Sequence, residues 1–395
     1  MATDHSSRRW LNRTVIGIGL ASLCSDWSHE IASAVLPAYL ATMGAAAAWL
    51  GFIEGTSDGF ASFAKLVSGF YADRLTRRKP IAVAGYVLTA LGTASLGFAS
   101  SAWQVLAARS TAWLGRGVRT PVRKALLAAA VTRETYGRAF GFERMMDTLG
   151  AIIGPTTALI LLQLLQHDYA RIFMLTVIPG LAAAALMAFA VKERSRVVSV
   201  QERFRASLGA LPLRFRRLLI AVGLFGLGDF AHTLLILLAV QRLAPEYGAA
   251  AAATAATGLY ILHNVLYAVF SMVAGAWADR MNKGRLLALG YALAGAMALL
   301  IVLAPLGLWA LAMIFMLGGI SVAVCETAED SYCAELVDDK QQGLAFGTLA
   351  TVNGLGDFAS SLIVGGLWTA FGAPVAFGYS ALLVLAGGLM VLRLS

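Results

Sequence analysis

The chain has 395 residues, of which 59% are hydrophobic and only 13% are charged, and its formal net charge is +9. Soluble domains average about 45–50% apolar and about 25% charged residues, so this composition excludes an ordinary soluble enzyme and also a disordered chain. The three cysteines show no CxxC spacing, which excludes a disulfide framework and a zinc signature.

Mostly apolar runs of about 20 residues, the length that crosses a bilayer, recur along the whole chain. The basic stretch before the first run has no small-residue cleavage site after it, so we expect no signal peptide. In chain order, the runs predict twelve transmembrane helices at 14–43, 47–72, 80–99, 102–131, 138–165, 170–191, 217–243, 248–277, 285–304, 306–335, 342–369 and 372–392.

The basic residues show which ends of these helices face the cytoplasm. They gather in the N-terminal segment, in the loops at 74–79 and 280–285, and in the segment 192–217, whereas the opposite loops hold little more than Arg171 and Arg242. The positive-inside rule therefore predicts a bacterial inner-membrane protein with both termini in the cytoplasm. Because the charges are spread over separate loops beside the bilayer, we expect no nucleic-acid partner.

An internal repeat relates the two halves of the chain. The segment 68–78, "SGFYADRLTRR", matches 274–284, "AGAWADRMNKG", and the segment 136–150 matches 342–356, both at an offset of 206 residues. We therefore expect an all-α membrane protein with two pseudo-symmetric six-helix bundles. The predicted domains are the N-terminal bundle 1–192, the cytoplasmic linker 193–216 and the C-terminal bundle 217–395.

Three motifs resemble signatures of the major facilitator superfamily. "GFYADRLTRRK" (69–79) is similar to its loop motif GxxxDRxGRR, and "RSTAWLGRGVRTP" (109–121) is similar to its fourth-span motif. "GAIIGPTTA" (150–158) resembles the fifth-span exporter motif GxxxGPxxG, with Thr157 or Ala158 at the last glycine. The resemblance covers almost the whole chain and points to a large prokaryotic branch. It implies the twelve-helix fold and rocker-switch alternating access.

The loop motif also has a physical interpretation. Asp73 ends the second span, where it can cap a neighbouring helix or accept from an arginine, and Gly69 permits close helix approach. The basic residues that follow can anchor to anionic headgroups. The resemblance implies that this cluster latches the two halves in one transport state, and a plain topology anchor is the alternative. The predicted gate residues of this motif and its repeat are Asp73, Arg77, Arg78, Asp279 and Arg280.

Ionisable groups inside spans are costly and by default mark transport pathways. Asp26, His29 and Glu30 share one face of the first span, and Asp229 and His232 repeat the pattern in the seventh. A carboxylate beside an imidazole suits a proton relay near neutral pH. Two carboxylates and two imidazoles also suit a divalent metal ion. Plain hydrogen bonding between helices is the third interpretation.

The second span adds to this candidate cavity. Glu54 and Asp58 share a face, and Lys65 lies about two turns further along it. Either Asp357 or Asn353 of the eleventh span is a candidate partner for Lys65, which otherwise snorkels to the interface. In the fifth span, Arg144 is expected to form a local ion pair with Asp147. The predicted proton, cation or substrate residues are Asp26, His29, Glu30, Glu54, Asp58, Asp147, Asp229, His232, Asn264 and Asp357.

Spans four and ten carry opposite charges at repeat-equivalent positions, as Arg123 matches Glu329. Such pairs can close a cytoplasmic gate and reopen, because wet ion pairs gain only modest free energy. A solvated cationic end that sets orientation and a site for an anionic substrate are alternatives. The predicted gate residues of these spans are Arg116, Arg119, Arg123, Glu326, Glu329 and Asp330.

The sequence contains no phosphate-binding loop, nucleophile elbow or HExxH motif, so ATP-driven transport and hydrolase chemistry are not expected. We predict a monomeric secondary transporter, not an enzyme, with no cofactor. Its driving force is a proton gradient, and its cargo is a small cationic or amphipathic solute moved outward. One alternative is a divalent-metal or metal-chelate carrier, and another is a non-transporting membrane receptor or scaffold. The metal alternative uses Asp26, His29, Glu30, Asp229 and His232.

Overall fold

The computed structural model describes residues 10–43, 47–193, 208–230 and 232–394. These residues are helical or lie in short connections, and none of them forms a β-strand. Residues 194–207, which make up most of the predicted linker, lie outside the described residues. The chain divides into two compact units, Met1–Leu211 with Val337–Thr351, and Pro212–Leu336 with Val352–Ser395. We call them unit 1 and unit 2.

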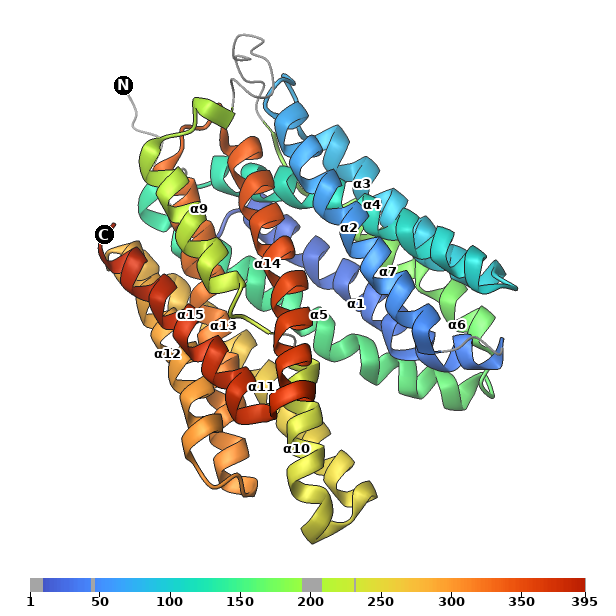
Figure 1. The fold of residues 1–395 in the computed structure, drawn as a ribbon. Coiled ribbons are helices and arrows are strands. Elements are labelled where there is room, and N and C mark those ends of the chain that lie inside the picture. Colours follow the sequence, from blue (N-terminus) through green and yellow to red (C-terminus); the bar gives the residue numbers. More distant parts are fainter. Residues whose placement is uncertain (1–9, 44–46, 194–207, 231, 395) are drawn as a thin grey trace, which may run out of the picture. The chain divides into compact units, whose positions relative to one another are not determined.

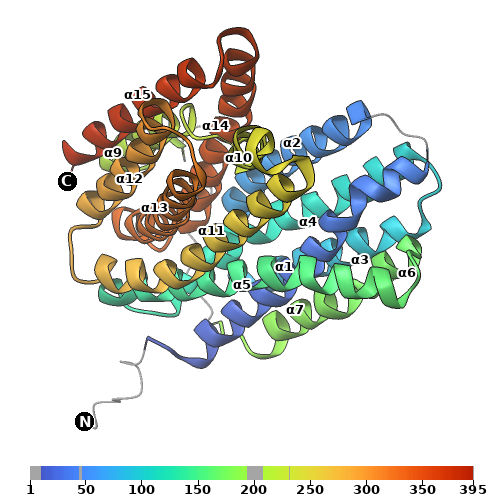
Figure 2. The ribbon, with the colours of Figure 1, turned by 90° about the horizontal axis from the view of Figure 1, so that it is seen from below.

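In unit 1, α1 packs against α5 and α7, and α4 packs against α2 and α3 (Figures 1 and 2). The close approach of α1 and α5 depends on Gly150 and Gly154, where any Cβ would overlap the backbone or side chain of α1. The helices of unit 1 are α1 (Arg13–Thr42), α2 (Ala47–Ala72), α3 (Lys79–Ser95), α4 (Ala102–Ala129), α5 (Tyr136–Leu164), α6 (Tyr169–Leu175) and α7 (Val177–Phe189).

In unit 2, α12 packs against α13 and α15, α11 packs against α10 and α13, and α9 packs against α15 (Figure 2). The helices of unit 2 are α9 (Leu213–Gly226), α10 (His232–Tyr247), α11 (Ala249–Ala278), α12 (Lys283–Leu303), α13 (Leu308–Leu336), α14 (Gln342–Phe371) and α15 (Ala373–Leu392). The first turns of α14, up to Thr351, group with unit 1.

All twelve predicted spans coincide with helices, but two of them are broken. The sixth is divided at Thr176 between α6 and α7, where Pro179 lacks the N–H that would bond back across the break. The seventh is divided between α9 and α10. Its residues Gly226, Gly228 and Asp229 are poor helix formers. The second break positions the site described below.

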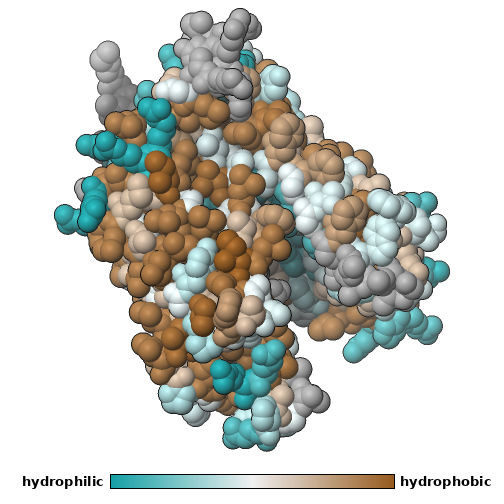
Figure 3. Space-filling model, in the orientation of Figure 1, coloured by the Kyte–Doolittle hydropathy of each residue, from teal (hydrophilic) through white to brown (hydrophobic). Residues whose placement is uncertain are grey.

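Seven helical segments of the described chain are long and apolar enough to cross a membrane by length and composition. Among the other predicted spans, the seventh is broken between α9 and α10, and α4 carries several charges. Large apolar side chains cover much of the visible surface (Figure 3). Phe189, Leu303 and Trp309 are among the most exposed. Exposure on this scale is typical of a surface that contacts lipid.

Candidate functional site

Four arginines of α4 lie in the interior of unit 1. Arg109, Arg116 and Arg123 follow one another at intervals of seven residues, about two helical turns, so they share one face of the helix. Arg119, between them, is only 1% exposed, and Arg123 is 4% exposed. A buried cation is tolerated only when carboxylates or other acceptors surround it. The partners of the four arginines therefore define the polar interior of this unit.

At one end, Arg109 contacts α1 and α2. Its Nη2 lies 2.9 and 3.1 Å from the carboxylate oxygens of Glu54 and 3.3 Å from Ser33 Oγ. Ser33 in turn lies 3.3 Å from His29 Nε2. The side chain of Trp113 completes the group, with the Arg109 guanidinium 4.9 Å from its ring centre and the His29 ring 4.4 Å from it.

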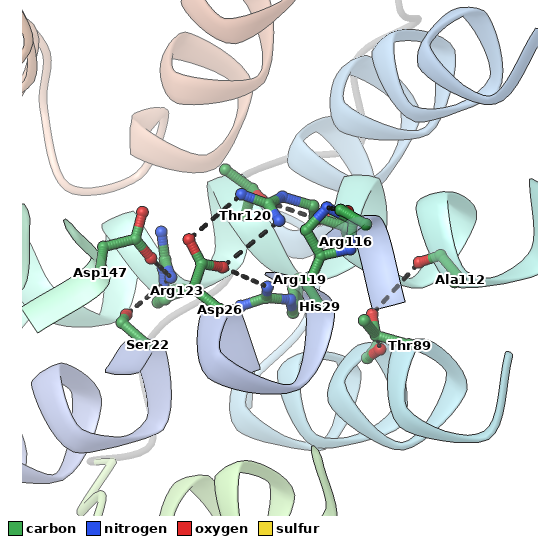
Figure 4. Close-up of polar contacts among 12 residues, drawn as sticks. Ser22, Asp26, His29, Thr89, Ala112, Arg116, Arg119, Thr120, Arg123 and Asp147 are labelled. Atoms are coloured by element: carbon green, nitrogen blue, oxygen red, sulfur yellow. Dashed lines mark hydrogen bonds and ion pairs between the residues drawn. The ribbon is translucent and has the colours of Figure 1, made fainter. Parts of the chain in front are cut away.

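In the middle, Asp26 of α1 lies between two arginines (Figure 4). Arg116 approaches its two oxygens at 3.3 and 3.4 Å, and Arg119 Nη2 lies 3.8 Å from Oδ1. The Arg119 guanidinium also lies 4.3 Å over the Tyr86 ring. His29 contacts Ser33 and Trp113 instead, so the structure shows Asp26 in an ion pair. The predicted proton relay between Asp26 and His29 stays a prediction.

At the other end, Arg123 joins α1, α4 and α5. It lies 2.8 Å from Glu143, 3.4 Å from Asp147 and 2.7 Å from Ser22 Oγ. Ser22 also donates to Glu143 at 2.9 Å. The predicted local pair of Arg144 and Asp147 is present at 3.4 Å. Arg123 thus has its acidic partners inside unit 1.

The loop after α2 makes the contacts that its sequence predicts. Asp73 pairs with Arg78 and accepts hydrogen bonds from the N–H groups of Gly343 (3.0 Å) and Leu344 (2.7 Å), so it caps the start of α14. A Cβ on Gly69 would overlap the Gly343 carbonyl, which confirms the predicted close approach. Burial raises the pKa of Asp73 to about 6, against the opposing effect of Arg78 and the two N–H groups.

The remaining gate residues of the loop motif and its repeat differ in their surroundings. Arg77 is exposed, and so is Arg280 of unit 2. Asp279 follows the last residue of α11. In unit 2 the cation near this position, Lys283, pairs with Glu335 of α13. The latch that the family resemblance implies stays a prediction.

Unit 2 contains a cavity of about 500 Å³, which we call the acidic cavity. Four carboxylates line it, those of Asp229, Glu326, Glu329 and Asp357, and its described lining includes no lysine or arginine. Aromatic and apolar side chains make up much of the remaining wall, together with His232, Cys325 and Asn353. The aromatic lining residues are Phe225, Phe230 and Tyr260.

Neutral groups donate hydrogen bonds to three acids of this cavity. Glu329, which is 5% exposed, accepts from the Tyr291 hydroxyl at 2.7 Å and from the Asn353 amide at 3.0 Å. The hydroxyl of Tyr267 donates to Glu326. Asp229 lies between α9 and α10, and its Oδ1 accepts from the N–H of Phe230 at 3.1 Å. Its carboxylate is within electrostatic reach of Glu326, Glu329 and Asp357.

The remaining predicted cavity and gate residues lie in different surroundings. Glu30 is half-buried within electrostatic reach of Arg109 and Arg116, and Asp58 is exposed near Lys65. Asn264 donates within its own helix to Tyr260 O at 3.1 Å. His232 stacks edge-on against His263 at 4.6 Å. Asp330 is buried near the end of α13.

The structure gives the metal alternative no support. In the part of the chain that it describes, no three His, Cys, Asp or Glu side chains form a group that could hold a metal ion. The predicted gate between spans four and ten stays a prediction. Arg123 has its acidic partners within unit 1 and Glu329 its donors within unit 2.

Comparison with known proteins decides the family. The model of the Major Facilitator Superfamily matches residues 18–242 and 218–395. The chain belongs to the major facilitator superfamily. The predicted fold, of twelve membrane helices in two six-helix bundles, is thereby confirmed, and so is the prediction that the protein is a transporter and not an enzyme.

Several relatives place the chain within this superfamily. An uncharacterized MFS-type transporter of Methanocaldococcus jannaschii is 27% identical over 389 residues, 98% of this chain and 96% of that protein. Multidrug resistance protein MdtH of Salmonella paratyphi B is 31% identical over 124 residues, 31% of this chain and 30% of that protein.

Two solved structures share the superfamily fold. The human organic anion transporter MFSD10 (TETRAN) has a TM-score of 0.79 at 17% identity, with 96% of this chain and 99% of that chain covered. The Escherichia coli fucose:proton symporter FucP has a TM-score of 0.76 at 18% identity, with 97% and 99% covered. At such low identity they show the fold alone.

Sequence reasoning missed several residues of both groups. Glu143, the main partner of Arg123, directly precedes the Arg144 whose local pair was predicted, and an acid in an apolar span was a sufficient signal. Tyr291, which donates to Glu329, gave no signal, because tyrosines in spans more often pack or anchor at interfaces.

Proposed function

We propose that the protein is a proton-coupled secondary transporter that exports a small cationic or amphipathic organic compound. It works as a monomer in the bacterial inner membrane, with both termini in the cytoplasm, by alternating access. The observation that carries this proposal is the acidic cavity of unit 2, where four carboxylates gather without a lysine or arginine in the described lining.

The physical argument is one of charge balance. An isolated carboxylate in a low-dielectric interior carries a desolvation penalty of several kcal/mol, and four within one cavity also repel one another. Protons or a cationic cargo that enter the cavity offset this repulsion. Because both satisfy the same carboxylates, binding of one favours release of the other, which is the basis of exchange between proton and cargo.

The size and walls of the cavity suit an organic cation. Ligand pockets typically measure about 300–1,000 Å³, and the acidic cavity, at about 500 Å³, lies within this range. Phe225, Phe230 and Tyr260 supply aromatic faces, which attract cations and apolar groups alike. The limited similarity to a multidrug resistance protein supports outward transport.

The arginines of unit 1 do not favour an anionic cargo. Arg109, Arg116 and Arg123 each lie within 3.4 Å of a carboxylate oxygen, and Arg119 shares Asp26 with Arg116. An anion would have to displace these internal carboxylates. A cation entering the acidic cavity, by contrast, relieves repulsion that is already there.

Transport by purified protein in liposomes tests the proposal. We expect an outward-directed proton gradient to drive uptake of tetraphenylphosphonium, and a protonophore to abolish it. The matched control is Asp338→Asn, an exposed acid of unit 1 that pairs with the exposed Arg133, and this variant should transport like the wild type. Uptake of an anionic probe instead of the cation, or cation flux that ignores the gradient, would show that the proposal is wrong.

A further inference from the structure

The acids of the acidic cavity are held by donors of two chemical kinds. Glu329 accepts from the Tyr291 hydroxyl and the Asn353 side-chain amide. A hydroxyl and a side-chain amide can each accept as well as donate. A protonated Glu329 can therefore donate to the same partners after the hydroxyl rotates or the amide flips. Tyr291 is fully buried and stacks on Phe225 at 3.9 Å, so its oxygen stays in place.

Asp229 accepts a hydrogen bond from a group that can donate but cannot accept. Its Oδ1 accepts from the backbone N–H of Phe230, and a backbone N–H can only donate, so this contact favours the ionised carboxylate. Asp229 lies in the short break between the end of α9 at Gly226 and the start of α10 at His232. The break between α9 and α10 therefore offers a fixed negative site to a positive group in the cavity.

The internal repeat supports this contrast. At the repeat offset, Glu329 and Asn353 correspond to Arg123 and Asp147 of unit 1. Both pairs are in contact, as an ion pair at 3.4 Å in unit 1 and as a hydrogen bond from the neutral Asn353 amide at 3.0 Å in unit 2. The fold thus brings these two positions together in each unit. In unit 2 no fixed cation at this pair holds the carboxylate in its charged form.

We propose that the acidic cavity divides its work between two carboxylates: Asp229 stays ionised and binds the cationic group of the cargo, whereas Glu329 binds and releases the coupled proton. This inference rests on the proposed function. A proton on Glu329 removes one negative charge from the cavity, so it weakens cation binding at Asp229, and a bound cation expels that proton.

The groups around Glu329 allow this exchange. Its own helix contributes Cys325, Glu326 and Asp330, α12 contributes Tyr291, α14 contributes Asn353, and the break between α9 and α10 contributes Asp229. None of these is a cation. Binding of positive charge is therefore the event that changes the electrostatic field at Glu329.

Equilibrium binding of tetraphenylphosphonium to the full-length protein in detergent tests the division, measured between about pH 5.5 and pH 8.5, where buried carboxyls can titrate. For the wild type, we expect the Kd to rise as the pH falls and the cation to release protons into weakly buffered solution. Asp229→Asn should raise the Kd about 10- to 100-fold at every pH, the range for a lost contact to a charged group. Asp229→Glu should restore binding.

Glu329→Gln should still bind the cation, but with a Kd that no longer depends on pH and without proton release. Asp338→Asn is the surface control for loss of a carboxylate, and thermal unfolding establishes that each variant is folded. A Glu329→Gln variant that keeps the wild-type pH dependence, or an Asp229→Asn variant that binds like the wild type, overturns the division. A wild type that binds no cationic probe at any pH overturns the proposed function itself.

Discussion

The pair of Arg123 and Glu143 offers a quantitative test of how unit 1 is stabilised. Glu143 is 1% exposed, lies 2.8 Å from Arg123 and accepts from Ser22 at 2.9 Å. Glu143→Ala removes both contacts and leaves a buried guanidinium with only part of its neutralising charge. Breaking a buried pair in this way costs about 3–5 kcal/mol. Glu143→Gln keeps an acceptor and should cost less, about 1.5–3 kcal/mol.

The double variant Arg123→Met with Glu143→Leu tests whether the cost arises from a buried charge without a partner. Replacing both charges by apolar side chains of similar size is often nearly neutral, because no charge remains buried without a partner. We expect the double variant to lose less stability than Glu143→Ala alone, since Asp147 keeps Arg144. The measurement is the free energy of unfolding in mixed detergent micelles, with exposed Arg133→Ala as the control. Strictly additive losses would refute the reasoning.

Changes at Gly69, Asp73 and Cys325 test the helix contact, the helix cap and the charge of the cavity. Gly69→Ala should cost about 1–3 kcal/mol of unfolding free energy, because the new methyl group overpacks against Gly343. The control Gly59→Ala, whose methyl group meets no neighbouring atom, should not destabilise the protein. Equal losses of stability in the two variants would contradict the contact. Because burial raises the pKa of Asp73 from 3.8 to about 6, the folded state takes up a proton in this range, so the contribution of Asp73 to stability falls as the pH rises through it. In Asp73→Asn this part of the pH dependence should disappear, as unfolding at a series of pH values would show. Cys325 lies in the wall of the acidic cavity. It should react at least about 10-fold faster with a cationic than with an anionic methanethiosulfonate, because the cavity acids concentrate cations. Mass spectrometry of the labelled protein gives the two rates, and equal rates would contradict a negatively charged cavity.

The helices could be predicted from the sequence because each apolar run is a local signal. The Asp73 cap was predictable for a similar reason, since a carboxylate at the end of a span has few partners other than a helix start or an arginine. The breaks in the sixth and seventh spans were not predicted. Their glycine, threonine and proline residues also occur inside intact membrane helices, so composition alone does not distinguish the two cases.

The partners of the buried charges depend on packing that the sequence does not display. Arg109 meets Glu54 across 55 positions of the chain, and Arg123 meets Ser22 across 101. Periodicity predicted which residues share a face, but not which faces pack together. The sequence therefore predicted Asp26 and His29 as partners on α1, whereas in the structure Asp26 forms ion pairs with arginines of α4.

The two units show how one repeated backbone can carry two kinds of chemistry. In unit 1, α1 runs unbroken past Asp26, and two arginines neutralise its carboxylate. In unit 2, the equivalent span is broken at Asp229, and a backbone N–H takes the place of the arginines. A fixed ion pair contributes to one rigid arrangement, because breaking it costs several kcal/mol. A carboxylate such as Glu329, which accepts from a hydroxyl and a side-chain amide, can change its charge at much lower cost. This makes unit 2 the half of the molecule in which to seek the exchange of cargo and proton.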